Sequence, residues 1–144
     1  MRTLHTEVGI LAPAERVWAI LADLPRWSEW NPFVVSIEGE LRVGAPLVAR
    51  LQPPGGKAMV FKPRVVKLEA GRELRWLGTL VFPGLFDGEH GFRVVPETEG
   101  RCRFEQFESF SGLLAAPILW FVEAQTREGF VAMNCALKAR AEAT

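Results

Sequence analysis

The amphipathic stretch at residues 113–142 constrains the fold of this chain more than any other feature. Apolar or small residues recur there at every third or fourth position, which is the spacing of one face of an α-helix. Pro117 suits the first helical turn, and no later proline interrupts the pattern. The pattern predicts one helix of roughly 25 residues, far above the mean of about 11, so it needs a large apolar partner surface. The residues on its apolar face are Leu114, Ile118, Phe121, Val122, Gln125, Gly129, Ala132, Met133, Ala136 and Leu137.

The segments before this helix predict that its partner is a β-sheet. Residues 3–11 alternate between apolar and polar positions, which indicates a strand. Pro13 then opens a short helix that ends before Pro25, and residues 26–32 form a second helical turn. Period-two patterns between turn signals predict six further strands, at 33–41, 47–51, 58–68, 73–80, 89–95 and 101–110.

Short turns between consecutive strands indicate an antiparallel meander. Pro63 lies within the strand at 58–68, which favours an edge position or a bulge there. We therefore expect one α+β domain over residues 1–144. In it, a curved antiparallel sheet of about seven strands wraps around the long C-terminal helix, and two short helices follow the first strand. A cavity can form between the curved sheet and the helix.

Charge and composition exclude several classes of function. Seventeen basic residues balance seventeen acidic ones, so no net positive field favours nucleic acid or an anionic membrane. The chain shows no leader and no apolar run of membrane-spanning length, which predicts a cytoplasmic protein without integral membrane association. Cys102 and Cys135 are too few for a disulfide framework, and we expect both to be reduced and buried. We expect no metal site and no cofactor.

One polar pair is a candidate for chemistry. If the last hairpin turns at Thr98 and Glu99, His90 lies directly opposite Glu108, and the preceding hairpin brings Trp76 beside His90. A carboxyl group against an imidazole can act as an acid/base pair or hold the polar end of a ligand. The two groups can also simply satisfy each other inside an apolar interior. A one-residue slip of register would turn Glu108 outward.

Large aromatic side chains are more numerous in the predicted sheet and helix than packing alone requires. Such rings usually build a core, but several should line the expected cavity and contact an apolar or aromatic ligand. Together with the polar pair and its neighbours, the predicted ligand-binding residues are Trp30, Phe33, Trp76, His90, Phe92, Phe104, Gln106, Glu108, Phe110, Ile118, Phe121 and Gln125.

An apolar loop separates two of the predicted strands. Its large side chains are Val81, Phe82, Leu85 and Phe86. An exposed apolar loop would mark a homodimer contact, a lid over the cavity or a membrane contact. The alternative is that these side chains fold back over the core.

Several strings of the sequence resemble the START-like superfamily of helix-grip proteins, also called SRPBCC, and its polyketide cyclase/dehydrase-like branch in particular. These strings are PAERVW at 13–18, WSEWNP at 27–32, LRW at 74–76, GEHGF at 88–92, FESFSG at 107–112 and GFVAMNCALK at 129–138. The resemblance covers the whole chain and implies the helix-grip fold. The superfamily contains lipid carriers, hormone receptors, allergens, aromatic cyclases and oxygenase domains, so it does not choose among functions. The oxygenase iron site needs two histidines and a carboxylate, whereas His5 and His90 face opposite ways.

We therefore interpret the sequence as a domain that holds a small hydrophobic or aromatic molecule in a cavity between sheet and helix. One alternative is a cyclase, dehydratase or isomerase in which His90 and Glu108 move a proton. Another is an interaction protein whose cavity has collapsed and whose apolar loop forms the partner surface.

Overall fold

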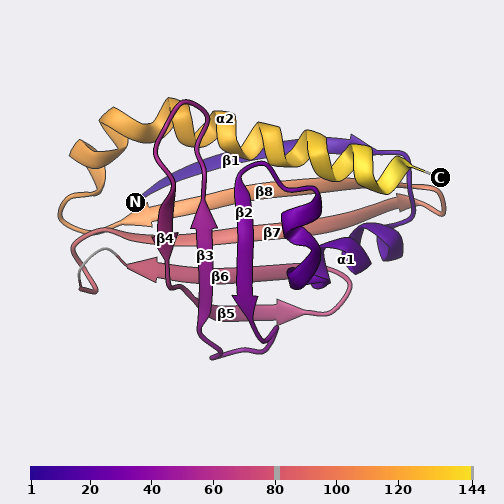
Figure 1. Ribbon diagram of the computed structural model, residues 1–144, viewed down its shortest axis with the longest axis horizontal. Coiled ribbons are helices and arrows are strands. Elements are labelled where there is room, and N and C mark those ends of the chain that lie inside the picture. Colours follow the sequence, from indigo (N-terminus) through magenta and orange to yellow (C-terminus); the bar gives the residue numbers. More distant parts are fainter. Residues whose placement is uncertain (80–81, 144) are drawn as a thin grey trace.

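The computed structural model describes residues 1–79 and 82–143 of the chain, and it has the α+β helix-grip architecture that the sequence predicts (Figure 1). Strand β1 is followed by two short helices, seven further strands in the described residues, and a long C-terminal helix. The elements are β1 (Arg2–Ile10), α1 (Ala14–Ala22), the 3-10 helix η1 (Leu24–Glu29), β2 (Val34–Gly39), β3 (Leu47–Leu51), β4 (Met59–Phe61), β5 (Arg64–Glu69), β6 (Glu73–Thr79), β7 (Asp87–Thr98), β8 (Arg101–Ser111) and α2 (Ala115–Glu142).

The strands form two antiparallel sheets instead of one continuous meander. The larger sheet has the order β1-β8-β7-β6-β5 and the smaller one the order β2-β3-β4. In Figure 1 the strands of the smaller sheet run across those of the larger sheet, and α2 lies along its β1 side. The expected number of about seven strands is therefore one too low for the described residues.

Pro63 is the reason for the extra strand. The predicted strand at 58–68 is split into β4 and β5, and these pair in different sheets. Proline has no N–H to donate, so it cannot continue a ladder, but its carbonyl oxygen accepts a hydrogen bond from Leu47 N at 2.8 Å. Both β4 and β5 are edge strands, as the proline predicted.

Helix α2 begins two residues later than predicted and presents a different face in its first half. Its buried side chains are Leu119, Gly129, Phe130, Met133, Asn134, Leu137 and Ala141. The prediction was wrong for Leu114 and Phe121, which are exposed, Phe121 to 82%. Residues 117–122 are all apolar, so their pattern carries no periodicity that could select a face.

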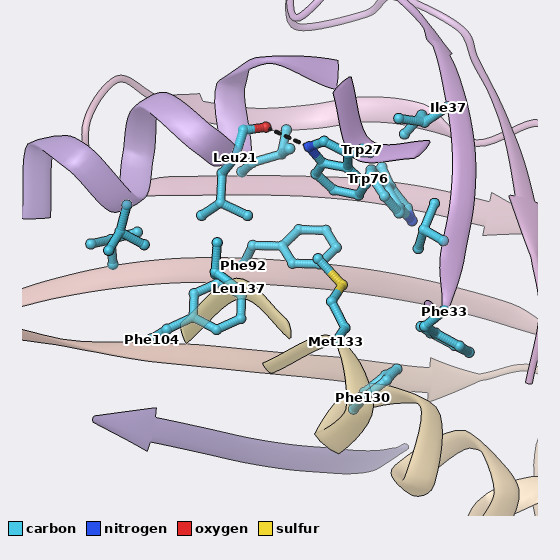
Figure 2. Packing of buried hydrophobic residues seen from close by; sticks show 14 of the residues in the cluster. Leu21, Trp27, Phe33, Ile37, Trp76, Phe92, Phe104, Phe130, Met133 and Leu137 are labelled. Atoms are coloured by element: carbon cyan, nitrogen blue, oxygen red, sulfur yellow. Dashed lines mark hydrogen bonds between the residues drawn. The ribbon is translucent and has the colours of Figure 1, made fainter. Parts of the chain in front are cut away.

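The core lies where α2, η1 and the larger sheet meet (Figure 2). Trp27 is fully buried, its Nε1–H donates to Leu21 O at 3.0 Å, and its ring meets Phe92 edge-on at 5.7 Å. Met133 and Phe130 reach the same cluster from α2. The buried N–H of Trp27 thus has a partner, as a buried donor requires.

The two cysteines differ in their surroundings. Both thiols are free, Cys102 is buried on β8, and burial raises its pKa. Cys135 is exposed on the outer side of α2, so the expectation that both are buried was wrong for this residue. Among the helices of the described residues, none is both long and apolar enough to cross a bilayer.

Candidate functional site

A cavity of about 270 Å³ lies between the inner face of the larger sheet, the smaller sheet and the first half of α2. The larger sheet contributes Trp76, His90 and Glu108, and α2 contributes Ile118 and Gln125. Its volume is close to the lower end of the usual range for ligand pockets, about 300–1,000 Å³.

The register of the larger sheet brings the polar pair together as the sequence predicted. His90 on β7 pairs with Glu108 on β8, and Trp76 on β6 pairs with His90. Side chains of directly paired residues lie on the same face of a sheet, so the three form one row across three strands. All three line the cavity.

Glu108 contributes a carboxyl group without a partner. Its side chain is 18% exposed, and His90 Nδ1 lies 3.6 Å from Glu108 Oε1. That separation is too long for a hydrogen bond, and the carboxyl accepts no other in the part of the chain that the structure describes. A Cβ at the neighbouring Gly88 would overlap Glu108 Oε2, so the glycine provides the space for this carboxyl. Burial raises the pKa of Glu108 to about 8.

His90 is almost completely buried among aromatic rings. Its imidazole stacks on Phe92 at 4.5 Å and lies 4.8 Å from the ring of Phe130. Burial lowers the pKa of His90 to about 4, although a hydrogen bond with Gln106 at 2.9 Å opposes that shift. At neutral pH the site therefore holds a protonated carboxylic acid beside a neutral imidazole.

Seven of the twelve predicted site residues line this cavity: Phe33, Trp76, His90, Glu108, Phe110, Ile118 and Gln125. The other five are corrections to the predicted lining, because they lie elsewhere. Phe92 and Phe104 are fully buried in the core, and Gln106 lies behind His90. Phe121 is on the surface, and Trp30 lines a separate outer groove.

The wall that the smaller sheet provides was not predicted from the sequence. This wall includes Ala49 and Leu51 on β3 and Met59 and Phe61 on β4. Ala49 and Leu51 lie in a segment correctly predicted as a strand, with side chains on one face. The sequence did not predict that this sheet crosses the larger one, because no local sequence pattern encodes how two sheets pack.

A family model described as polyketide cyclase / dehydrase and lipid transport matches residues 1–142, nearly the whole chain. The chain belongs to this family. Membership supports ligand binding or a cyclase role in general terms, and small hydrophobic molecules as its partners. None of the curated proteins matches the chain in sequence.

Solved structures resemble this family member over almost its full length. An aromatase/cyclase, Zhui from Streptomyces sp. R1128, has a TM-score of 0.80 at 19% identity and covers 98% of this chain and 93% of its own. Norcoclaurine synthase from Thalictrum flavum, in complex with dopamine and hydroxybenzaldehyde, has a TM-score of 0.73 at 15% identity. The match covers 96% of this chain and 85% of the synthase chain. A START superfamily protein from Mycobacterium smegmatis has a TM-score of 0.72 at 18% identity, and the match covers 97% of each chain. These likenesses establish the shared fold.

The outer groove of this cyclase/dehydrase-family protein is a weaker candidate site. It has a volume of about 300 Å³ and lies between α1, η1 and the end of α2. Its three arginines are already engaged. Arg26 pairs with Asp23 at 3.3 Å and Arg140 with Glu29 at 2.7 Å, whereas Arg16 donates to Ala141 O at 2.5 Å.

Three side chains on the outer face of the larger sheet stand close enough to hold a metal ion: His5, Glu7 and Glu105. Glu105 is also bound by Arg93 at 2.7 Å and Arg103 at 3.0 Å. These two cations lower the pKa of Glu105 against the opposing effect of its burial, and they compete with any metal for its oxygens. Ion pairing therefore accounts for this cluster.

The apolar loop folds only partly over the core. Phe86 stacks on Phe110 at 5.6 Å and lines the cavity, whereas Phe82 is 55% exposed. Leu85 is half-buried, and Leu114 N donates to its carbonyl at 2.9 Å. Val81 lies outside the described residues.

Proposed function

We propose that this protein binds a small aromatic or otherwise apolar molecule in the cavity, with the polar end of that molecule at His90 and Glu108. The observation that carries the proposal is the unpartnered carboxyl of Glu108 in a mostly apolar wall. A polar group that is mostly withdrawn from water and has no partner is destabilising, so its presence at a cavity favours a ligand that supplies the missing hydrogen bond.

Aromatic side chains support the same proposal. Trp76, Phe33 and Phe110 present ring surface to the cavity. Rings of this kind bind flat apolar molecules through burial and through stacked or edge-on contacts. The ligands in the norcoclaurine synthase structure, dopamine and hydroxybenzaldehyde, are small aromatic molecules.

The test is native mass spectrometry of protein purified from its own host, followed by a thermal-shift screen of small aromatic molecules. We expect a stoichiometric bound molecule or a screened ligand whose binding is lost in Trp76→Ala. Trp120→Ala is the matched control, because Trp120 is 84% exposed and lies outside the cavity. Ile118→Trp, which fills the cavity without removing a core side chain, should also abolish binding. A protein that is empty and unchanged by every compound would refute the proposal.

A second candidate function, a cyclase, dehydratase or isomerase, is favoured by the difference between the two pKa values. A neutral imidazole can accept a proton and a protonated carboxylic acid can donate one, so His90 would act as base and Glu108 as acid. This function predicts a bell-shaped pH–rate profile whose limbs follow the pKa values of about 4 and about 8. It also predicts a large loss of rate in His90→Ala.

The third hypothesis, an interaction protein with a collapsed cavity, is less well supported because side chains leave the cavity open. A homodimer through the apolar loop remains part of our proposal, with exposed Phe82 as the main contact. Sedimentation of wild type and Phe82→Ser would test it. A wild-type monomer at all concentrations would exclude the dimer.

A further inference from the structure

Behind His90 lies a chain of buried polar side chains that the proposed function does not use. Thr6 on β1, Gln106 on β8 and Asn134 on α2 are all buried, and Gln106 is fully so. They join three elements that meet only in the folded protein.

Two backbone carbonyls, which can only accept, fix the direction of every hydrogen bond among these polar side chains. Thr6 Oγ1 lies 2.9 Å from Gln106 O, so the hydroxyl proton of Thr6 is committed to that carbonyl. Thr6 Oγ1 must therefore accept from Asn134 Nδ2 at 2.9 Å. This turns Asn134 Oδ1 toward Gln106 Nε2, at 2.8 Å, and the same Nε2 also donates to Phe130 O at 3.3 Å.

The orientation of the Gln106 amide decides which nitrogen of His90 carries the proton. Gln106 Oε1 faces His90 Nε2 at 2.9 Å, and an amide oxygen accepts, so Nε2 is the protonated nitrogen. The low pKa of His90 keeps the ring neutral, so Nδ1 has a free lone pair. That lone pair faces Glu108 Oε1 at 3.6 Å, on the cavity side.

We propose that Gln106, held by Asn134 and Thr6, is a positioning residue that fixes His90 Nδ1 as a hydrogen-bond acceptor beside the Glu108 donor. The cavity therefore selects ligands that bear a hydroxyl group, such as a phenol or an enol. One hydroxyl can donate to Nδ1 and accept from the carboxyl at the same time, with its oxygen about 2.8 Å from each. A carbonyl or ether oxygen can only accept and leaves Nδ1 without a donor. An ammonium can only donate. The inference rests on the proposed ligand binding at this site.

The first test needs no ligand. Nitrogen NMR of the labelled protein reports which ring nitrogen of His90 carries the proton, and His5→Asn assigns the signals because the chain has only two histidines. We expect the proton on Nε2 at neutral pH. A proton on Nδ1 overturns the inference, whatever the protein binds.

The second test compares β-naphthol with its methyl ether by titration calorimetry. The ether can still accept from the Glu108 carboxyl, so the naphthol adds one hydrogen bond, to Nδ1, and should bind about tenfold more tightly. In Gln106→Met, this preference should fall to about threefold or less and His90 should populate both tautomers, while the affinity for the ether stays unchanged. Gln52→Met is the control, because Gln52 also donates to a single backbone carbonyl, that of Gly56 at 2.7 Å, but outside the cavity.

The outcomes separate the inference from the proposed function. Equal affinities for the naphthol and the ether in wild type overturn the inference and leave aromatic binding standing. A preference that survives in Gln106→Met overturns the positioning role of Gln106. If that variant fails to fold, Thr6→Val replaces it, with Thr3→Val as the control on the same strand. Failure of both compounds to bind overturns the proposed aromatic binding itself.

Discussion

Replacing Glu108 with Gln should remove a pH dependence of stability that the wild-type protein shows near neutral pH. The substitution keeps the size of the side chain but removes its titration. In the folded protein burial raises the pKa of Glu108 from 4.5 to about 8. The folded state therefore retains a proton that the unfolded chain releases, and the free energy of unfolding falls as pH rises between these values.

His90 produces the opposite trend at lower pH. Its pKa falls from 6.5 to about 4 on folding, so the unfolded chain takes up a proton below 6.5 and stability rises with pH over that interval. The two effects oppose each other between pH 4.5 and 6.5. Between pH 6.5 and 8 the effect of Glu108 dominates and the remaining titration of unfolded His90 opposes it slightly, so the wild type should lose about 1 kcal/mol of unfolding free energy there.

Urea denaturation at closely spaced pH values measures this loss directly. Wild type should lose stability between pH 6.5 and 8, whereas Glu108→Gln should not, and the variant should be the more stable protein at the upper end. Glu69→Gln, at an exposed position on β5, is the control and should keep the wild-type slope. Curves for wild type and Glu108→Gln that stay parallel across this interval would show that Glu108 is ionised in the cavity, and the reasoning would fail.

Two further predictions concern packing. Gly91→Ala should lower the free energy of unfolding by roughly 1–3 kcal/mol, because a Cβ there would overlap the ring of Phe107. Gly100→Ala is the control and should change it little, because a Cβ there would meet nothing within 4 Å. Urea denaturation of both variants measures the difference, and equal effects would contradict the prediction. Phe130→Ala should cost about 3–5 kcal/mol, since Phe130 is fully buried, whereas Phe121→Ala should stay within about 0.5 kcal/mol. A large loss in Phe121→Ala by the same measurement would mean that α2 presents a different face to the core.

Local patterns determined the elements of this fold because each pattern reports its own segment. The period-two alternation of 3–11 corresponds to β1, and the long amphipathic stretch corresponds to α2. Even the pairing of His90 with Glu108 was predicted from the last hairpin, although the turn itself pairs Thr98 with Arg101 and a shift of register between Pro96 and Thr98 completes the pairing. The two groups proposed to carry function were therefore accessible from the sequence.

Other features depend on how distant segments meet, and no local pattern encodes that. The apolar run at 117–122 left the face of α2 undetermined until packing against the sheet buried Leu119 and exposed Phe121. The smaller sheet became a wall of the cavity because β2, β3 and β4 pair in a sheet of their own, which runs across the larger one.

Gln106 shows the same division between sequence and structure. The sequence placed it on the inner face of its strand, and β1 and α2 then supplied Thr6 and Asn134 to hold it behind His90. The sequence by itself thus determined which residues face inward. Only the tertiary structure decided which of them line the cavity, because a buried group's environment and pKa are set by neighbours that are far away along the chain.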